Sequence, residues 1–106
     1  KVRPDSSDLH RNVASALRCL GVPIANEIKV FEGTFHIDLV VGAGDPEEPR
    51  GKIAVEVDGP AHFVPGTRDP IYQTVIKRWL LQRAGYCDVS VPYFDWSLVS
   101  SSPVQR

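Results

Sequence analysis

Three carboxylates and one histidine are spaced so that they could act together. Glu56 and Asp58 alternate with valines in the stretch "IAVEVDGPAH", residues 53–62, and in an extended strand two residues that are two apart lie on one face. Asp38 occupies a polar position in the apolar segment that would form a neighbouring strand, and His62 follows Asp58 by four residues. Carboxylates this close raise one another's pKa unless a cation neutralises them. The pattern indicates either a site for chemistry or a solvated sheet face with surface acids.

The three histidines differ in whether the sequence suggests a functional role for them. His62 lies in the loop that leaves the acidic strand, so it can be either a structural hydrogen-bonding residue or a group that transfers a proton. His36 flanks Asp38 in the same segment, and His10 lies in the first apolar-patterned segment. Neither of these two histidines has a partner that would give it a role.

Apolar spacing predicts the elements in the first half of the chain. Residues 6–21 have capping residues, helical spacing and a terminal glycine, which is typical of an amphipathic helix. Residues 26–33 and 34–42 predict two short strands joined by a hairpin at Gly33 and Thr34. Residues 42–51 are rich in proline, glycine and acids, so they predict a loop. The apolar residues expected to face the core from the helix are Leu9, Val13, Ala16, Leu17 and Leu20.

The second half begins with the acidic strand and continues with a helix. Asp69 is the expected N-cap of this helix, with Pro70 in its first turn and Gly85 at its end. Its broad apolar stripe is expected to be buried, with Trp79 in the core, whereas Gln73 and Lys77 lie off that stripe. The stripe consists of Ile71, Tyr72, Val75, Ile76, Trp79 and Leu80. Residues 86–94 predict a fourth strand, and residues 95–101 a short helix or turn.

The order of elements predicts the fold class. A strand, a helix and a strand in succession favour parallel pairing of the third and fourth strands, while the first three can pair antiparallel. We therefore expect an α/β fold of order α-β-β-β-α-β, with a mixed central sheet flanked by helices.

Composition limits the classes of function. The chain has 106 residues, of which 42% are apolar and 24% charged, with a formal net charge of -1. This is typical of one globular domain, and no apolar run approaches the roughly 20 residues that span a bilayer. A nucleic-acid role would need a local basic patch. Cys19 and Cys87 have no CxxC spacing, so we expect free buried thiols in a reducing compartment. Because the chain begins at a lysine, we expect an excised domain whose targeting segment lies elsewhere.

Three stretches in this order resemble the RAP domain. They are "IAVEVDGPAHF", "IKRWLLQRAGY" and "VSVPYFDW", and the resemblance covers residues 35–98. The RAP domain is an RNA-binding domain that is abundant in apicomplexans and also occurs in FAST-kinase-like mitochondrial proteins and in plastid proteins. The resemblance implies that residues 1–106 are a single RAP-type domain at the C-terminus of a longer helical-repeat protein. It implies binding of single-stranded organelle transcripts or rRNA, in RNA processing, stability or translation, in the mitochondrion or alternatively in a chloroplast or other plastid.

The RAP family in turn resembles the PD-(D/E)XK nucleases, especially the very-short-patch-repair endonucleases, which share the order of elements given above. Asp38 then matches the metal-binding acid of the second strand and Glu56 the acid of the third. Asp58 occupies the place of the nuclease lysine, which orients water and stabilises charge on the phosphate. The resemblance implies, as an alternative function, a metal-dependent endoribonuclease. In it Asp38, Glu56 and Asp58 would hold Mg²⁺ or Mn²⁺, with His62 as general base and Lys77 replacing the missing lysine.

The RNA-binding function requires no cofactor and uses a different set of residues. Basic side chains of the second helix and its preceding loop would meet phosphates, and aromatic side chains after the fourth strand would stack on bases. The candidates are His62, Arg68, Gln73, Lys77, Arg78, Arg83, Tyr93 and Trp96. Burial of Tyr93, Phe94 and Trp96 in the core is the alternative for the aromatic residues. A third hypothesis is a protein-interaction domain whose aromatic and acidic loop meets a basic partner.

Overall fold

A computed structural model of the chain describes residues 6–100. Its helices and strands follow the predicted order, with a short 3₁₀ turn added, and a third helix begins two residues before the short helix or turn predicted at residues 95–101. They are α1 (Ser6–Cys19), β1 (Ile24–Val30), β2 (Phe35–Val41), β3 (Ile53–Asp58), the 3₁₀ turn η1 (Pro60–His62), α2 (Tyr72–Ala84), β4 (Cys87–Pro92) and α3 (Tyr93–Ser100). No helix among these residues is long and apolar enough to cross a membrane.

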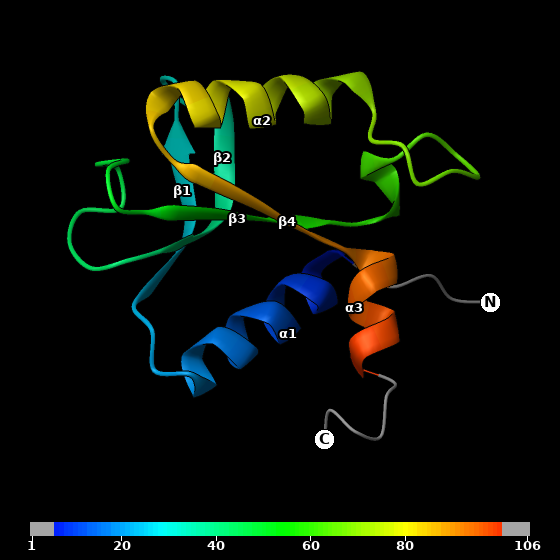
Figure 1. The fold of residues 1–106 in the computed structure, drawn as a ribbon, viewed down its shortest axis with the longest axis horizontal. Coiled ribbons are helices and arrows are strands. Elements are labelled where there is room, and N and C mark those ends of the chain that lie inside the picture. Colours follow the sequence, from blue (N-terminus) through cyan, green and yellow to red (C-terminus); the bar gives the residue numbers. More distant parts are fainter. Residues whose placement is uncertain (1–5, 101–106) are drawn as a thin grey trace.

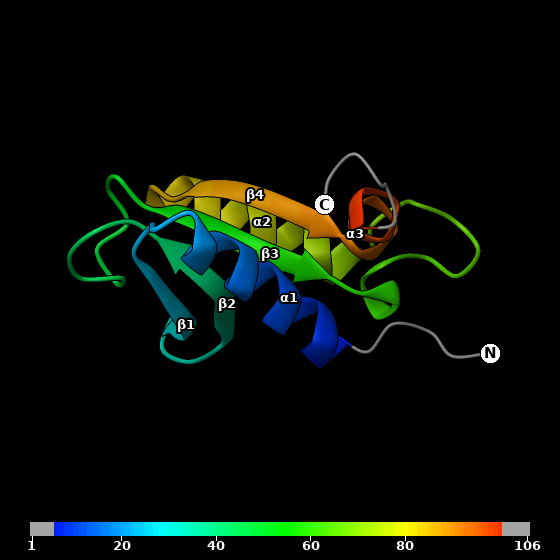
Figure 2. The same cartoon turned by 90° about the horizontal axis from the view of Figure 1, so that it is seen from below.

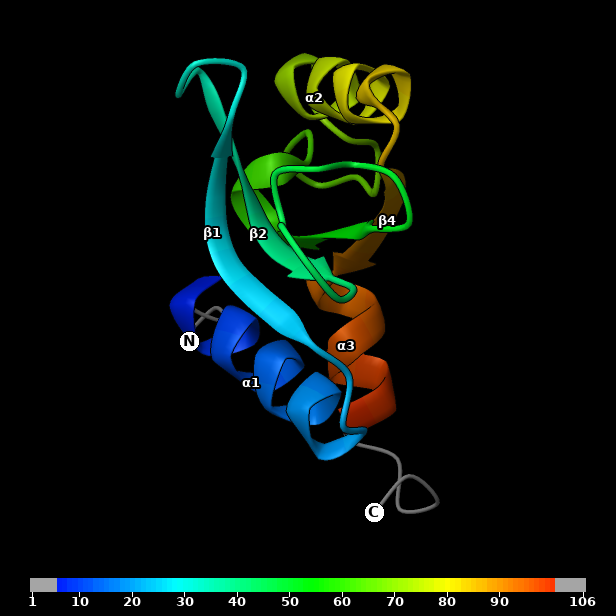
Figure 3. The ribbon, with the colours of Figure 1, turned by 90° about the vertical axis from the view of Figure 1, so that its left-hand side faces the viewer.

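The four strands form one sheet in the order β1-β2-β3-β4. β1 pairs with β2 and β2 with β3 in antiparallel fashion, whereas β3 and β4 are parallel, which confirms the predicted mixed sheet. Figure 1 shows α2 on one side of the sheet and α1 with α3 on the other, and the view in Figure 3 agrees. The sheet is therefore the middle of three layers, and α2 is the crossover between β3 and β4.

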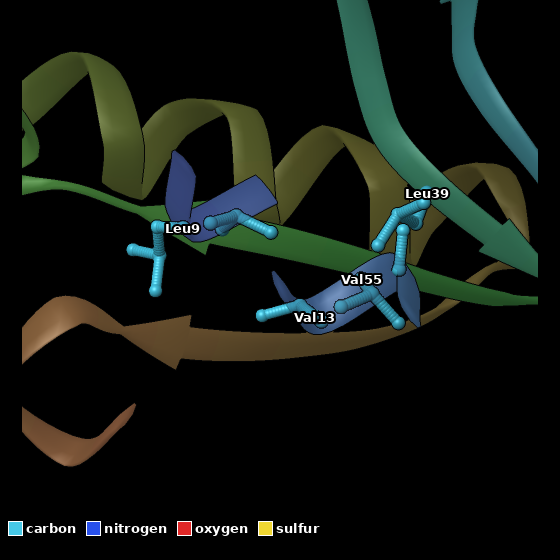
Figure 4. Packing of buried hydrophobic residues seen from close by; sticks show 6 residues of the cluster. Leu9, Val13, Leu39 and Val55 are labelled. Carbon is cyan, nitrogen blue, oxygen red and sulfur yellow. The ribbon is translucent and has the colours of Figure 1, made fainter. Parts of the chain in front are cut away.

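The core on the α1 side joins one face of α1 to the central strands. Leu9 and Val13 of α1 pack with Leu39 of β2 and Val55 of β3 (Figure 4). Figure 2 shows α1 lying along these strands, with α3 at the end of β4. Packing of this apolar face, more than helix propensity, stabilises a helix of this length.

The predicted core face of α1 is wrong at three positions. Ala14 is buried and Ala16 is exposed. With 3.6 residues per turn, Leu9, Val13 and Ala14 lie on one arc of the helix, and Ala16 falls just outside that arc, beyond Leu9. Leu20 lies beyond the end of the helix and is 75% exposed.

Both faces of β3 are covered, so its polar face is not solvated. Its burial is continuous from Ala54 to Asp58. Glu56 is only 3% exposed and Asp58 only 1%, so the interpretation of these acids as surface groups is wrong. Next to them, Ala54 packs with Val40 of β2 and Leu81 of α2 in a second apolar cluster. The two carboxylates are thus at the edge of a core beneath α2.

The orientation of α2 differs most from the prediction. Leu81 is its buried apolar residue, and Lys77 and Arg78 point toward the sheet, where they contact acids of β3. Val75 and Trp79, both expected in the core, are exposed. The reason is the sheet face itself: it carries carboxylates, so the helix turns its cationic face inward.

The start of α2 also differs. Its N-cap is Ile71, so the prediction of Asp69 as N-cap is wrong. The backbone before the helix pairs with the chain that leaves β3: Phe63 bridges to Pro70, and the N–H of Ile71 donates to the carbonyl of His62 at 2.9 Å. This extended pairing holds the backbone before Ile71 out of the helix.

The hairpin between β1 and β2 is where it was predicted, but its geometry is unusual. Phe31 and Glu32 both have a φ of 55° before Gly33 at 85°. The N–H of Gly33 donates to the carbonyl of Val30. Two central residues with positive φ match the twist of the strands, and this turn generally selects glycine or asparagine. Here an ordinary phenylalanine and glutamate adopt it.

The two cysteines are free, as predicted, but both are exposed, so the expectation that they are buried is wrong. Cys19 is the last residue of α1 and Cys87 the first residue of the edge strand β4. Apolar patterning around a cysteine therefore did not predict burial at the ends of elements.

Candidate functional site

A cavity of about 300 Å³ lies between the end of β3, η1 and the first half of α2. Acidic residues of β3 and basic residues of α2 form part of its wall, and smaller or apolar side chains complete it. The lining residues are Phe35, Glu56, Asp58, Ala61, His62, Ile71, Gln73, Thr74, Lys77 and Arg78. Four residues proposed from the sequence to contact nucleic acid, and two of the proposed metal ligands, therefore meet at one place.

Asp58 is the centre of a buried hydrogen-bond network. Its Oδ1 accepts from Nδ1 of His62 at 2.7 Å, and its Oδ2 accepts from Nη2 of Arg78 at 2.9 Å and from the hydroxyl of Ser90. Arg78 Nη2 also donates to Ser90 Oγ at 3.0 Å. Burial opposes ionisation of Asp58, but the hydrogen bonds from His62, Ser90 and Arg78 outweigh it and lower its pKa. Asp58 is thus an ionised hub that joins η1, α2 and β4 to β3.

The contact with Asp58 shifts the pKa of His62 in the opposite direction. The hydrogen bond to Asp58 raises the pKa of His62 above its usual value, although partial burial opposes this. A carboxylate beside an imidazole favours the imidazolium form. The raised pKa thus favours the charged form of His62, which disfavours a role as a general base that must accept a proton.

Glu56 has a different environment. Its Oε1 lies 2.6 Å from Nζ of Lys77, whereas its Oε2 is buried without a hydrogen-bond partner. Burial raises the pKa of Glu56 from 4.5 to about 7, because the nearby ammonium of Lys77 only partly compensates for lost hydration. Glu56 therefore changes protonation near neutral pH, and its second oxygen is enclosed by the protein without a hydrogen-bond partner.

Asp38 forms a hydrogen bond with the backbone of β3. Its Oδ2 accepts a hydrogen bond from the N–H of Val57 at 2.8 Å. The paired residues of β2 and β3 run only from Val41 and Ile53 to Leu39 and Val55, so this side chain supplies the next acceptor after the strands separate. Asp38 therefore closes the end of the β2–β3 ladder.

In this arrangement the three acids do not form a set of metal ligands. Both oxygens of Asp58 accept protein hydrogens, Asp38 holds the backbone of Val57, and Lys77 neutralises Glu56. Over the part of the chain that the structure describes, no three His, Cys, Asp or Glu side chains are grouped to hold a metal ion.

The other sequence-predicted binding residues lie away from the cavity wall. The guanidinium of Arg83 lies 4.7 Å from the ring centroid of Trp79, and that of Arg68 lies 4.6 Å from the ring centroid of Phe94. Tyr93 and Trp96 are partly buried and pack against the core on the α1 side. The two arginine–aromatic pairs thus lie apart from the cavity, whereas Tyr93 and Trp96 of α3 form part of the core boundary.

Two residues of the site, Ser90 and Phe35, were not predicted from the sequence. Ser90 is paired in register with Glu56 across the parallel strands, which brings its hydroxyl to Asp58. A serine between valines in "VSV" was the available signal, since the parallel pairing had been predicted. Phe35 of the cavity wall was expected only as a strand residue, and no sequence pattern links it to η1 or α2.

A match to a known protein family covers most of the residues that form the cavity wall. Residues 55–103 match the family model of the RAP domain. The matched region begins within β3 and includes η1, α2 and β4, and thus most of the cavity wall. No solved structure gives a significant match to the chain. Over residues 55–103 the chain therefore carries a RAP domain, a domain of RNA-binding type.

Proposed function

We propose that this chain binds single-stranded RNA and serves as the RNA-recognition module of an organelle factor for RNA processing, stability or translation. The observation that carries the proposal is the RAP domain, which includes the whole of α2. Support from the structure lies in the outward face of that helix, which has the composition of a stacking surface.

The outward face of α2, defined by Tyr72, Val75, Trp79 and Arg83, is apolar and aromatic. Tyr72 is 77% exposed, Val75 47% and Trp79 55%. Residues three, four and seven apart share one face of a helix, and seven residues advance about 10 Å along its axis. Two aromatic rings at this spacing can each stack on a base of an extended single strand.

The outward face of α2 offers one cation to a polyanion, although the whole chain is slightly acidic. The helix contains Lys77, Arg78 and Arg83 and no acidic residue. Lys77 and Arg78 are paired with acids of β3, so Arg83, stacked over Trp79, is the cation of the outward face. One cation beside two rings favours binding dominated by stacking, with a modest dependence on salt.

The finer parts of the proposal rest on the resemblance. A mitochondrial location, or alternatively a plastid one, and a PD-(D/E)XK ancestry of the fold are proposals. The order of elements, the mixed sheet and the closeness of Lys77 to Glu56 support the ancestry.

The test is retention of end-labelled single-stranded RNA by the purified chain. Trp79→Ala removes a ring of the outward face, and Leu20→Ala is the matched control, because Leu20 is an exposed apolar residue elsewhere. Loss of one base stack corresponds to about 1–3 kcal/mol, or roughly 5- to 150-fold in affinity. We expect at least the lower value for Trp79→Ala and no change for Leu20→Ala. Equal retention by both variants would contradict the proposed surface, and absence of retention by the wild type would favour a protein-interaction domain.

The second candidate is a metal-dependent nuclease, and the contact between Lys77 and Glu56 favours it. It ranks below binding because protein donors already engage the oxygens of Asp58 and one oxygen of Asp38. The same RNA incubated with Mg²⁺, Mn²⁺ or a chelator separates the two. We expect retention without cleavage; metal-dependent cleavage that is lost in Glu56→Ala would replace our proposal with the nuclease.

A further inference from the structure

The cavity beneath the first half of α2 presents cationic side chains to solvent and keeps its carboxylates behind them. The side chains of His62, Arg78 and Lys77 are 37%, 26% and 18% exposed. Those of Asp58 and Glu56 are only 1% and 3% exposed. All of these residues line the cavity. A group that enters from solvent therefore meets the three basic side chains before it approaches either carboxylate.

The basic side chains keep N–H donors that their ion pairs do not use. Asp58 accepts from Nδ1 of His62, which leaves Nε2 as the second donor of the charged ring. The ammonium of Lys77 has three N–H donors, and Glu56 is its ion-pair partner within residues 6–100. Gln73, an exposed residue in the first turn of α2, adds its side-chain amide to the wall. Several donors thus converge on one small cavity, which suits a ligand group that consists of acceptor oxygens.

We propose that the cavity binds one backbone phosphate of the RNA, with Nε2 of His62 and Nζ of Lys77 donating to its oxygens. This inference rests on the proposed function and specifies which part of the RNA enters this site. Hydrogen bonds between charged donors and phosphate oxygens are stronger than those between neutral groups. The cavity therefore adds a charge-dependent contact to the stacking of bases on the outward face of α2.

The charges of the wall are sufficient to hold a singly charged anion. Three cationic and two anionic side chains line the cavity. The raised pKa of His62 favours its charged form, and Glu56, with a pKa of about 7, is only partly ionised at neutral pH. A phosphate that links two nucleotides carries one negative charge, which compensates the excess positive charge of the wall.

The cavity also lies beside the proposed stacking surface. Tyr72 and Gln73 are consecutive residues in the first turn of α2. Tyr72 belongs to the outward face and is highly exposed, whereas Gln73 lines the cavity. A nucleotide whose base stacks on Tyr72 can therefore place a neighbouring phosphate in the cavity.

The experiment removes the charge of the phosphates while it keeps the bases. The probes are 2′-O-methyl oligouridylate and the same oligomer with uncharged methylphosphonate linkages. Fluorescence anisotropy gives their affinities, and NMR follows Nε2 of His62, with the exposed His36 of β2 as the internal control. Inorganic phosphate, compared with chloride at equal ionic strength, tests the anion alone.

A pair of variants makes the same change of charge at two places. Gln73→Glu adds a negative charge to the cavity wall, and Asn12→Asp adds one at an exposed position of α1. Both replace an amide with a carboxylate of similar shape. Thermal unfolding verifies that both variants fold.

We expect the charged oligomer and inorganic phosphate to shift the Nε2 signal of His62 but not the signals of His36. The wild type and Asn12→Asp should bind the charged oligomer at least about five-fold more tightly than Gln73→Glu does, since the lost contact joins charged groups. The methylphosphonate oligomer should bind more weakly and leave the Nε2 signal unchanged.

Three results would overturn the inference. If the charged oligomer binds without a shift of the Nε2 signal, or if Gln73→Glu binds it as tightly as Asn12→Asp does, the inference fails and the proposed function stands. If inorganic phosphate shifts the signal but the wild type does not bind the charged oligomer, the proposed function fails, and with it the assignment of the anion to RNA.

Discussion

Protonation of Glu56 should make the stability of this chain fall as the pH rises through neutrality. Burial raises the pKa of Glu56 in the folded state to about 7, against 4.5 when the residue is hydrated. The folded state thus binds this proton more tightly than the unfolded state. The resulting stabilisation is complete below pH 4.5 and is lost as the pH rises through about 7. A difference of this size in pKa corresponds to about 3 kcal/mol.

Glu56→Gln isolates this contribution, because the amide is similar in shape and does not titrate. Urea unfolding at intervals from pH 4.5 to 8.5 gives the free energy of unfolding of each protein. We expect the wild type to lose about 3 kcal/mol more than Glu56→Gln over this range. His62, with a raised pKa, loses its stabilisation in the same direction as the pH rises, but it is present in both proteins. The lowered pKa of Asp58 acts below pH 3.8, outside the range.

Parallel stability curves for the two proteins would refute the reasoning, because they would mean that Glu56 keeps an ordinary pKa. A carbon NMR titration of the Glu56 carboxyl provides an independent measurement. A midpoint near 7 is expected, and a midpoint near 4.5 would show that water or Lys77 compensates fully for burial.

Two further predictions concern the same network. Asp58→Asn should lower the free energy of unfolding by about 3–5 kcal/mol, because it leaves the guanidinium of Arg78 partly buried without its anion. Urea unfolding measures this loss, and the substitution Asp45→Asn, at an exposed residue, is the control. Losses of equal size in the two variants would contradict the role assigned to Asp58. Lys77→Met should move the pKa of Glu56 above about 7, since the ammonium is the main group that lowers it; a carboxyl titration midpoint that falls or stays unchanged would contradict this.

The fold was predictable to the extent that its signals are local. Alternation in β2 and β3, the glycine turn between β1 and β2, and the succession β3-α2-β4 each follow from short stretches of sequence. They were sufficient to predict strand order and the parallel pairing of β3 with β4. Which face of α2 is buried could not be predicted in the same way. Periodicity assumes that the apolar stripe meets the core, and here the facing sheet contributes Glu56 and Asp58.

The candidate site, too, was predictable only where its contacts follow from local sequence. The closeness of Glu56, Asp58 and His62 is a property of spacing along one segment, so sequence alone suggested it. Asp38 was correctly placed on the neighbouring strand, but its partner is the backbone N–H of Val57. That contact depends on where two strands separate, which is set by tertiary packing.

The buried charges and the exposed rings are consequences of one orientation of α2. With 3.6 residues per turn, the side of the helix that holds Lys77 is opposite the side that holds Val75 and Trp79, which are two residues before and two residues after it. Ion pairs to Glu56 and Asp58 fix the first side against the sheet, and this necessarily directs the second side to solvent. The buried carboxylates of β3 are therefore also the reason that this RAP domain presents an aromatic surface. Asp58→Asn should weaken retention of single-stranded RNA by displacing Trp79, although Asp58 itself does not contact the RNA; unchanged retention would contradict this.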